Sequence, residues 1–233
     1  MIDLHRSAVD AIRAGDVETL EALLLEHPSL AKARPDRART LLHVVADRPG
    51  HFPRGAETVA ALARAGAEPD ARFLGRHGET PLHWAASSGD MAVLDALLDA
   101  GADIEADGAT IAGGTALTNA RVFGNWAAAR RLVERGAVPS LDDAAALGLV
   151  RRVTSALDAA PPQPEDLDRA FWYACHGGSR TTAELLLNRG ADVDHRPSWE
   201  DATPLDAALR TGAADVAEWL RTRGARRAAE LRP

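Results

Sequence analysis

The chain has 233 residues, which is enough for one or two globular domains, and its net charge is −7. Hydrophobic residues make up 46% of the chain but aromatic residues only 4%, a combination that favours close-packed small helices over a thick sheet sandwich. The acidic balance argues against a general nucleic-acid binder, because such a protein needs a basic face for the phosphates.

Cysteine and lysine usage indicate the redox compartment of the protein and the kind of genome that encodes it. The single cysteine, Cys175, excludes an intrachain disulfide and fits a reducing compartment. Segment 1–15 has no apolar run typical of a signal peptide, and no segment approaches the length of a membrane span. We therefore expect a cytoplasmic protein without membrane contact. Lys32 is the only lysine among 27 basic residues, a bias that favours a GC-rich bacterial genome.

The most regular stretch, residues 78–106, predicts two helices joined by a tight turn. Thr80 can cap a first helix that starts at Pro81, where the missing N–H costs little. His83 can bond back to Thr80, and His43 holds the same position after Thr40, so we expect both histidines to help cap their helices. Gly89 ends that helix, and Asp90 is placed to cap a second one. The second helix has an apolar stripe at helical spacing, made of Val93, Leu94, Leu97 and Leu98. This helical hairpin has too little core to fold alone.

The motif Thr80-Pro81-Leu82-His83-x-Ala85 resembles the signature of the ankyrin repeat, which has a period of about 33 residues. Related patterns recur along the whole chain, strongly in the third, sixth and seventh units and weakly in the first and fifth. The resemblance implies an all-α solenoid of stacked helix–turn–helix units with short finger loops, forming a single domain over 1–233. The expected units are 3–34, 36–74, 76–108, 109–138, 139–165, 166–197 and 198–227.

Several units depart from the family pattern. The second unit carries an insertion rich in proline and glycine, around 48–56, which predicts a surface loop or, alternatively, a lip over a binding site. No finger fits between the fourth and fifth units. At the position of the signature histidine, the fourth, sixth and seventh units have Thr118, Trp172 and Asp206.

In proteins of this family the inner helices and fingers form a concave groove, so the resemblance implies recognition of a protein partner there. We expect Trp84, Asn119, Asp143 and Tyr173 to lie half-exposed on the groove side. The predicted binding residues are Phe73, Arg76, Trp84, Asn119, Phe123, Trp172, Tyr173, His176 and Trp199. Aromatic side chains with polar tips are common interface anchors. Packing is the competing interpretation for Trp84 and Trp172, and an incidental surface position for His176.

The sequence lacks the patterns of an enzyme. It has no phosphate-binding loop, nucleophile elbow or dinucleotide fingerprint, and its histidines lack the spacing of a zinc site, so we expect no cofactor and no metal. The alternative function is a small-molecule pocket around Trp84, Asn119, Trp172, Tyr173 and His176. In that pocket His176 is a weak candidate for a general acid–base and the tryptophans form the walls.

Overall fold

The computed structural model describes residues 4–47, 50–109, 113–160 and 162–231, and these residues form helices and loops with no assigned strand. The chain divides into two compact units, Met1–Ala137 (unit 1) and Val138–Pro233 (unit 2). The division falls where the sequence leaves no room for a finger loop. The all-α class predicted from the sequence is therefore confirmed, while the prediction of one seven-unit domain stays a prediction.

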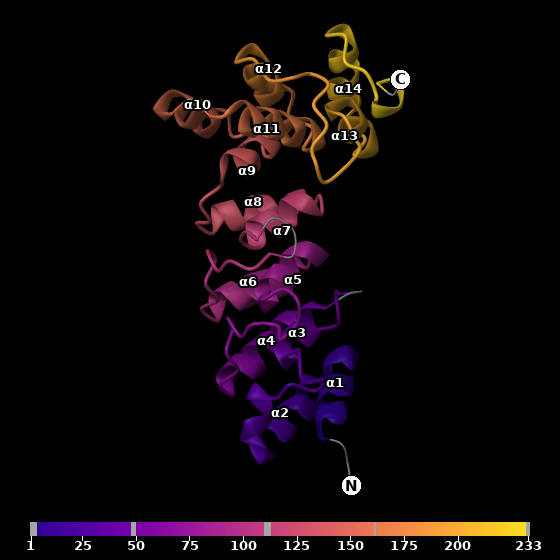
Figure 1. The fold of residues 1–233 in the computed structure, drawn as a ribbon. Helices are drawn as coiled ribbons and strands as arrows, with labels where there is room; N and C mark the ends of the chain where they lie inside the picture. The colour runs from indigo at the N-terminus through magenta and orange to yellow at the C-terminus, as the bar shows by residue number, and fades with distance from the viewer. Residues whose placement is uncertain (1–3, 48–49, 110–112, 161, 232–233) are drawn as a thin grey trace. The chain divides into compact units, whose positions relative to one another are not determined.

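Unit 1 consists of four helical hairpins, in which odd-numbered helices pack on odd-numbered ones and even-numbered on even-numbered ones (Figure 1). We call the first set the inner helices and the second set the outer helices. Their bounds are α1 (Leu4–Ala14), α2 (Val17–Glu26), α3 (Leu41–Ala46), α4 (Gly55–Arg64), α5 (Pro81–Ser88), α6 (Met91–Asp99), α7 (Ala116–Val122) and α8 (Trp126–Glu134), with a short 3-10 helix at Pro28–Lys32.

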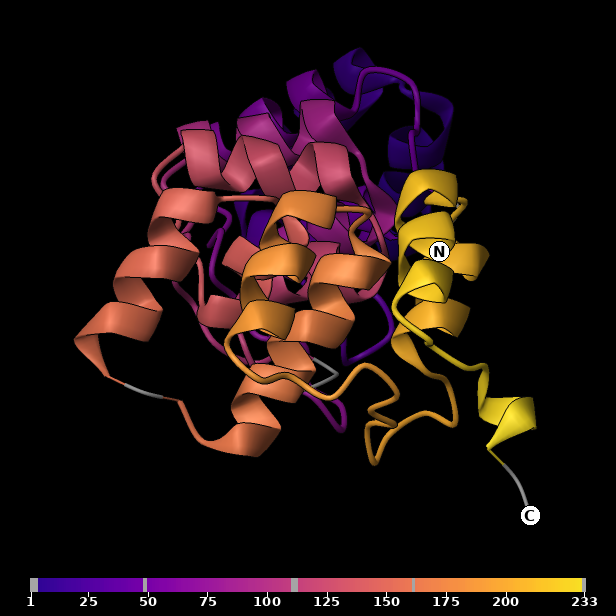
Figure 2. The same cartoon turned by 90° about the horizontal axis from the view of Figure 1, so that it is seen from above.

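Unit 2 repeats this arrangement with three hairpins, and its inner helix α11 packs on both α9 and α13. A long loop, residues 189–203, joins α12 to α13 and is followed easily in Figure 2. The bounds are α9 (Leu141–Ala146), α10 (Val150–Ala159), α11 (Pro164–His176), α12 (Arg180–Asn188), α13 (Pro204–Arg210) and α14 (Ala214–Thr222), followed by a 3-10 helix at Ala228–Glu230. Its core is centred on the fully buried Phe171 and Leu186.

The hairpin at residues 81–99 forms as the sequence predicts. Gly89 adopts a left-handed conformation with φ of 73° and ends α5. Asp90 then caps α6, because its Oδ1 accepts the N–H of Val93 at 3.1 Å. A side chain with a Cβ at position 89 would be strained at this φ and would press on Asn125 of the next repeat.

Backbone hydrogen bonds close the finger loops. Phe73 N–H donates to the carbonyl of Glu79 at 2.8 Å, and Ala109 N–H donates to the carbonyl of Gly114 at the same distance. The first of these fingers also bonds back to the preceding connector, since Leu74 N–H donates to the Ala38 carbonyl at 3.1 Å. Neighbouring fingers are therefore linked, although part of the second finger lies outside the described residues.

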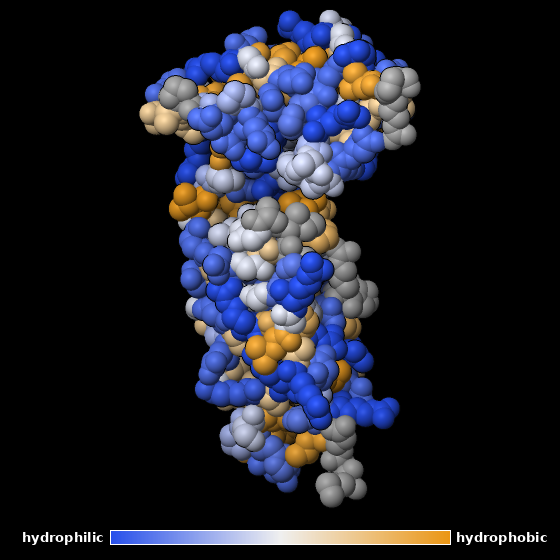
Figure 3. All heavy atoms as spheres, in the orientation of Figure 1, coloured by the Kyte–Doolittle hydropathy of each residue, from blue (hydrophilic) through white to orange (hydrophobic). Residues whose placement is uncertain are grey.

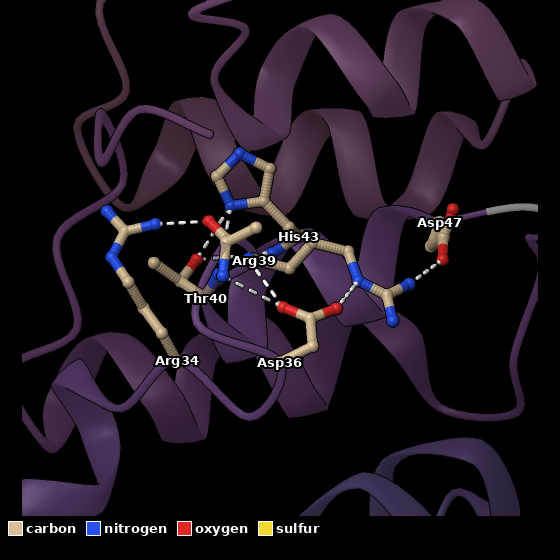
Figure 4. Close-up of polar contacts among 7 residues, drawn as sticks. Arg34, Asp36, Arg39, Thr40, His43 and Asp47 are labelled. Carbon is tan, nitrogen blue, oxygen red and sulfur yellow. Dashed lines mark hydrogen bonds and ion pairs between the residues drawn. The ribbon is translucent and has the colours of Figure 1, made fainter. Parts of the chain in front are cut away.

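The connector between the first two hairpins is held by charged groups (Figure 4). Asp36 Oδ1 accepts the backbone N–H of Arg39 at 2.8 Å, and the Arg39 guanidinium bridges the carboxylates of Asp36 and Asp47. Arg34 donates to the Ala38 carbonyl from the other side. This network fixes the backbone that leads into Thr40, where the next inner helix starts.

The described part of the insertion in the second unit is a loop, as predicted. Pro53 lies so close to the turn at Gly15 that a Cβ there would come within 2.6 Å of its carbonyl oxygen. On the other side, His51 N–H donates to Asp90 Oδ2 at 2.9 Å. The loop thus contacts the turns of the first and third hairpins. Residues 48–49 lie outside the described part of the chain, and a role as a lip stays a prediction.

Candidate functional site

The signature histidines of unit 1 tie each inner helix to the next repeat. Thr40 N–H donates to His43 Nδ1 at 3.3 Å, and His43 Nε2–H donates to the carbonyl of Glu79 at 3.1 Å. In the next repeat, His83 Nε2–H donates to the carbonyl of Gly114 at 3.3 Å. Accepting at Nδ1 while donating at Nε2 requires the neutral imidazole. Burial lowers the pKa of His43 to about 4, which agrees with that state. The predicted capping role is confirmed.

Trp172 occupies the same position in unit 2 and makes the same bond with a different group. Its indole Nε1–H donates to the carbonyl of Ala202 at 2.9 Å. Ala202 directly precedes Thr203, just as Glu79 precedes Thr80 in unit 1. Trp172 is only 2% exposed. The indole therefore fills the place of the histidine and supplies its outer hydrogen bond.

Carboxylates take this position elsewhere in unit 2. Asp143 Oδ2 accepts the N–H of Ser140 at 3.0 Å, and Asp206 Oδ2 accepts the N–H of Thr203 at 3.2 Å. The expectation that Asp143 is half-exposed on the groove side is wrong. It is 3% exposed, because α9 has one residue fewer between its cap and its turn glycine, Gly148, than the regular repeats have.

A buried carboxylate in unit 1 accepts hydrogen bonds from two of the predicted binding residues. Glu79 is 8% exposed, and its Oε2 accepts the indole Nε1–H of Trp84 at 3.0 Å. Its Oε1 accepts the amide Nδ2–H of Asn119 at 2.7 Å. Asn119 also donates to the His83 carbonyl at 3.3 Å and is 1% exposed, so the expectation of a half-exposed Asn119 is wrong. Burial lowers the pKa of the nearby His83.

Two rings, those of His43 and Phe73, lie next to the Trp84 indole in unit 1. The ring centres of His43 and Trp84 are 5.0 Å apart in an edge-to-face arrangement, and those of Phe73 and Trp84 are 5.4 Å apart. We call His43, Phe73 and Trp84 the unit 1 ring cluster. Arg76, at the tip of the same finger as Phe73, is exposed and has no part in the cluster's ring contacts.

A second group of rings lies in unit 2 and contains four predicted residues: Trp172, Tyr173, His176 and Trp199, which we call the unit 2 ring cluster. Trp199 lies nearly parallel to Tyr173, with ring centres 6.0 Å apart and an interplanar angle of 15°. Trp172 stands edge-on to both, at 5.2 Å from Tyr173 and 6.2 Å from Trp199, and stacks on His176.

Exposure separates these residues into three classes. Tyr173 and His176 are 6% and 7% exposed, so Tyr173 is more buried than the half-exposed position expected for it. Phe123 and Trp199 are 45% and 48% exposed. The buried rings form a base, Phe73 and Trp84 are partly exposed, and Phe123 and Trp199 are the aromatic residues that another molecule reaches most easily.

Two interactions at these clusters escape a reading of the sequence. Glu79 precedes a signature threonine, and only the fold shows that Trp84 and Asn119 converge on it. Arg210 lies with its guanidinium carbon 5.7 Å from the centre of the Trp172 ring and forms an ion pair with Glu200. The feature of the sequence that points to this second interaction is the carboxylate of Glu200 directly after Trp199.

Other groups with reactive potential have structural surroundings. Cys175 is fully buried, and burial raises the pKa of its thiol, which keeps it protonated and unreactive. Among the described residues no group of three or more His, Cys, Asp or Glu side chains is placed to hold a metal ion. Within that same part of the chain, no helix combines the length and apolarity needed to cross a membrane. The face in Figure 3 is mainly polar, with scattered apolar residues in each unit.

The repeated hairpins, finger bonds and histidine caps agree with the comparison to known families. A model described as "Ankyrin repeats (3 copies)" matches residues 8–108 and 54–143, and one described as "Ankyrin repeats (many copies)" matches residues 166–221. The chain belongs to the ankyrin-repeat family. Ankyrin repeats are generally modules for protein–protein interaction. No curated protein matches the chain.

The predicted small-molecule pocket draws on both units. Trp84 and Asn119 belong to unit 1, whereas Trp172, Tyr173 and His176 belong to unit 2. A site that combines residues of both units stays a prediction. Within unit 2 the three rings pack on one another and are 2% to 7% exposed, which leaves little of their surface for a ligand.

Proposed function

We propose that the protein binds another protein through the inner helices and finger loops of its ankyrin units, without catalysing a reaction. The observation that carries the proposal is where large apolar side chains remain exposed. Of the seven such residues in the described part of the chain, four belong to fingers or inner-helix ends: Leu74, Phe123, Trp199 and Leu209. Leu25 and Val150 lie on outer helices and Val138 in a connector. Exposed aromatic and apolar groups on a rigid support are the usual anchors of an interface.

The support beneath these residues favours recognition with little reordering. Trp199 is stacked on Tyr173, and the Phe73–Trp84 contact beside Leu74 is fixed by the hydrogen bond from Trp84 to Glu79. A surface that is already ordered loses less conformational entropy on binding than a flexible one. The predicted concave groove gains support from this pattern, because the fixed rings belong to inner helices and fingers.

Site-specific photo-crosslinking tests the proposal. Benzoylphenylalanine replaces Phe123 at the end of an inner helix, and in the matched control it replaces the exposed Ala127 on the neighbouring outer helix. In unit 2 the pair is Trp199 and the exposed Thr181. We expect the same partner protein to be captured from positions 123 or 199 and not from the controls.

Alanine substitution then measures the contribution of each anchor. Trp199→Ala and Phe123→Ala are expected to weaken binding of the captured partner by about 2 kcal/mol, or about 30-fold in Kd. Equal crosslinking from the outer-helix positions, or unchanged affinity in both alanine variants, would contradict binding through the inner helices and fingers.

A further inference from the structure

Trp199 is presented to solvent by a loop that is fixed at several points. Glu200 N–H donates to the Pro197 carbonyl at 3.2 Å, which forms a tight turn around Trp199. The bond from Trp172 to the Ala202 carbonyl holds the end of the loop against α11. One face of the Trp199 indole lies on Tyr173, and 48% of the residue remains exposed. The exposed part of the indole is therefore fixed in orientation and accessible to a ligand.

Two carboxylates and two arginines, Arg196 and Arg210, lie around this indole. Glu200 and Asp201 follow Trp199 directly, and their side chains are 32% and 49% exposed. A cavity of about 410 Å³ opens beside them, lined by residues 196–201. The face of an indole ring attracts cations, and adjacent carboxylates add to that attraction.

The molecule itself shows which cation suits this arrangement. The Arg210 guanidinium lies over the Trp172 ring and pairs with Glu200, so an indole face and a carboxylate of this loop already hold one guanidinium between them. Trp199 and Asp201 offer the same two groups on the exposed side. Guanidinium is planar, stacks on aromatic faces and pairs with carboxylates through several N–H groups, which an ammonium cannot do.

We propose that the exposed face of Trp199, together with Asp201, binds an arginine side chain of the partner protein. This inference rests on the proposed protein-binding function and names the chemistry that one part of it recognises. Arg196, which is 3.3 Å from Asp201 and half-exposed, is the internal competitor. Ion pairs between exposed groups contribute little, so an incoming guanidinium stacked on Trp199 can replace it.

The test is a titration of the whole protein with the tripeptide acetyl-Gly-Arg-Gly-amide, followed by NMR of the indole N–H signals. The Trp199 signal is identified from its loss in Trp199→Phe, and Trp126 and Trp219 serve as internal references. The matched control ligand contains citrulline, which keeps the planar shape of arginine without its charge. We expect a dose-dependent shift at Trp199, at least about threefold larger with arginine than with citrulline or lysine.

Two variants sharpen the result. Asp201→Asn is expected to weaken tripeptide binding about threefold, and Arg196→Gln to strengthen it by a similar factor, because it removes the competitor. Equal shifts with citrulline, an unchanged affinity in both variants, or a larger response to an oligothymidylate would overturn the arginine assignment. If crosslinking captures a partner while the tripeptide fails, only this inference falls. If neither succeeds, the proposed function falls with it.

Discussion

The two units solve the same capping problem with groups of different acidity. In unit 1 the inner helices α3 and α5 are capped by His43 and His83, whose neutral rings bond outward to Glu79 and Gly114. In unit 2 the corresponding outward bond comes from Trp172, and carboxylates cap α9 and α13. What the two histidine repeats share with the Trp172 repeat is the acceptor, a backbone carbonyl just before the next inner helix.

This difference shows that the fold constrains the direction of a donor more than its chemical identity. Imidazole and indole both carry an N–H at the end of a flat ring, and both reach the carbonyl at about 3 Å. Only the imidazole can also take up a proton. The comparison therefore predicts that acid acts on the two units unequally.

The largest expected effect is a loss of stability in unit 1 on acidification. Burial lowers the pKa of His43 from 6.5 to about 4. Between these two pH values the unfolded chain therefore binds a proton at His43 that the folded chain does not bind. The free energy of unfolding is thus expected to fall by about 3 kcal/mol between pH 6.5 and pH 4, on account of His43 alone. Above pH 6.5 this contribution is fully present.

Urea unfolding followed by NMR at several pH values measures this effect in each unit. The indole signals of Trp84 and Trp126 report on unit 1, and those of Trp172 and Trp219 on unit 2. His43→Gln is expected to flatten the pH dependence, whereas His5→Gln, at an exposed position, leaves it unchanged. Equal acid sensitivity of the two sets of signals in the native chain would refute the comparison.

The next effect in size tests the outward hydrogen bond of Trp172 in unit 2. Trp172→Phe removes the N–H donor and leaves the Ala202 carbonyl without its partner, at an expected cost of about 2 kcal/mol in unfolding free energy. Trp172→His restores a donor at the position that histidine occupies in unit 1. It is expected to recover part of the stability near neutral pH and to lose it again in acid.

Chemical denaturation of both variants, at neutral pH and near pH 4, provides the measurement. A Trp172→His protein whose stability is as insensitive to acid as that of the native chain would argue against an equivalent site. Equal stability of Trp172→Phe and the native protein would show that the bond to Ala202 contributes nothing.

Periodic features of the chain were predictable, because each rests on a local requirement. The helix pair around Gly89, the cap at Asp90 and the histidine caps follow from spacing within one repeat. The expectation for Asp143 is wrong for a related reason. A position counted back from the turn glycine, Gly148, is correct only when the inner helix has the regular length, and α9 is one residue shorter. A local count fails wherever a repeat has lost a residue.

The candidate site was predictable only in outline. Aromatic residues on inner helices and fingers pointed to the two ring clusters, but burial did not follow from their repeat positions. Asn119 and Tyr173 are buried because groups distant in sequence cover them: Asn119 bonds to Glu79, 40 residues earlier, and Trp199 lies over Tyr173. Such partners come from neighbouring repeats, and no pattern inside a single repeat specifies them.

The ring clusters themselves differ in what holds them, and Glu79 provides the smallest test. In unit 1 the Trp84 indole is oriented by a hydrogen bond to a buried carboxylate, whereas in unit 2 the Trp172 indole donates to a backbone carbonyl. Glu79→Gln keeps the size of the side chain but offers one acceptor oxygen to two donors, Trp84 and Asn119. The unpaired donor is expected to cost about 1 kcal/mol of unfolding free energy.

The signature of this variant is its confinement to unit 1. The Trp84 indole signal is expected to shift and broaden as the ring loses its fixed orientation, while the signals of Trp172 and Trp199 stay in place. Glu68→Gln is the matched control, because Glu68 is an exposed carboxylate in the same finger that pairs only at the surface with Lys32. If both variants leave the Trp84 signal unchanged, packing against Phe73 and His43 is sufficient to orient the indole, and the carboxylate of Glu79 is not needed for this.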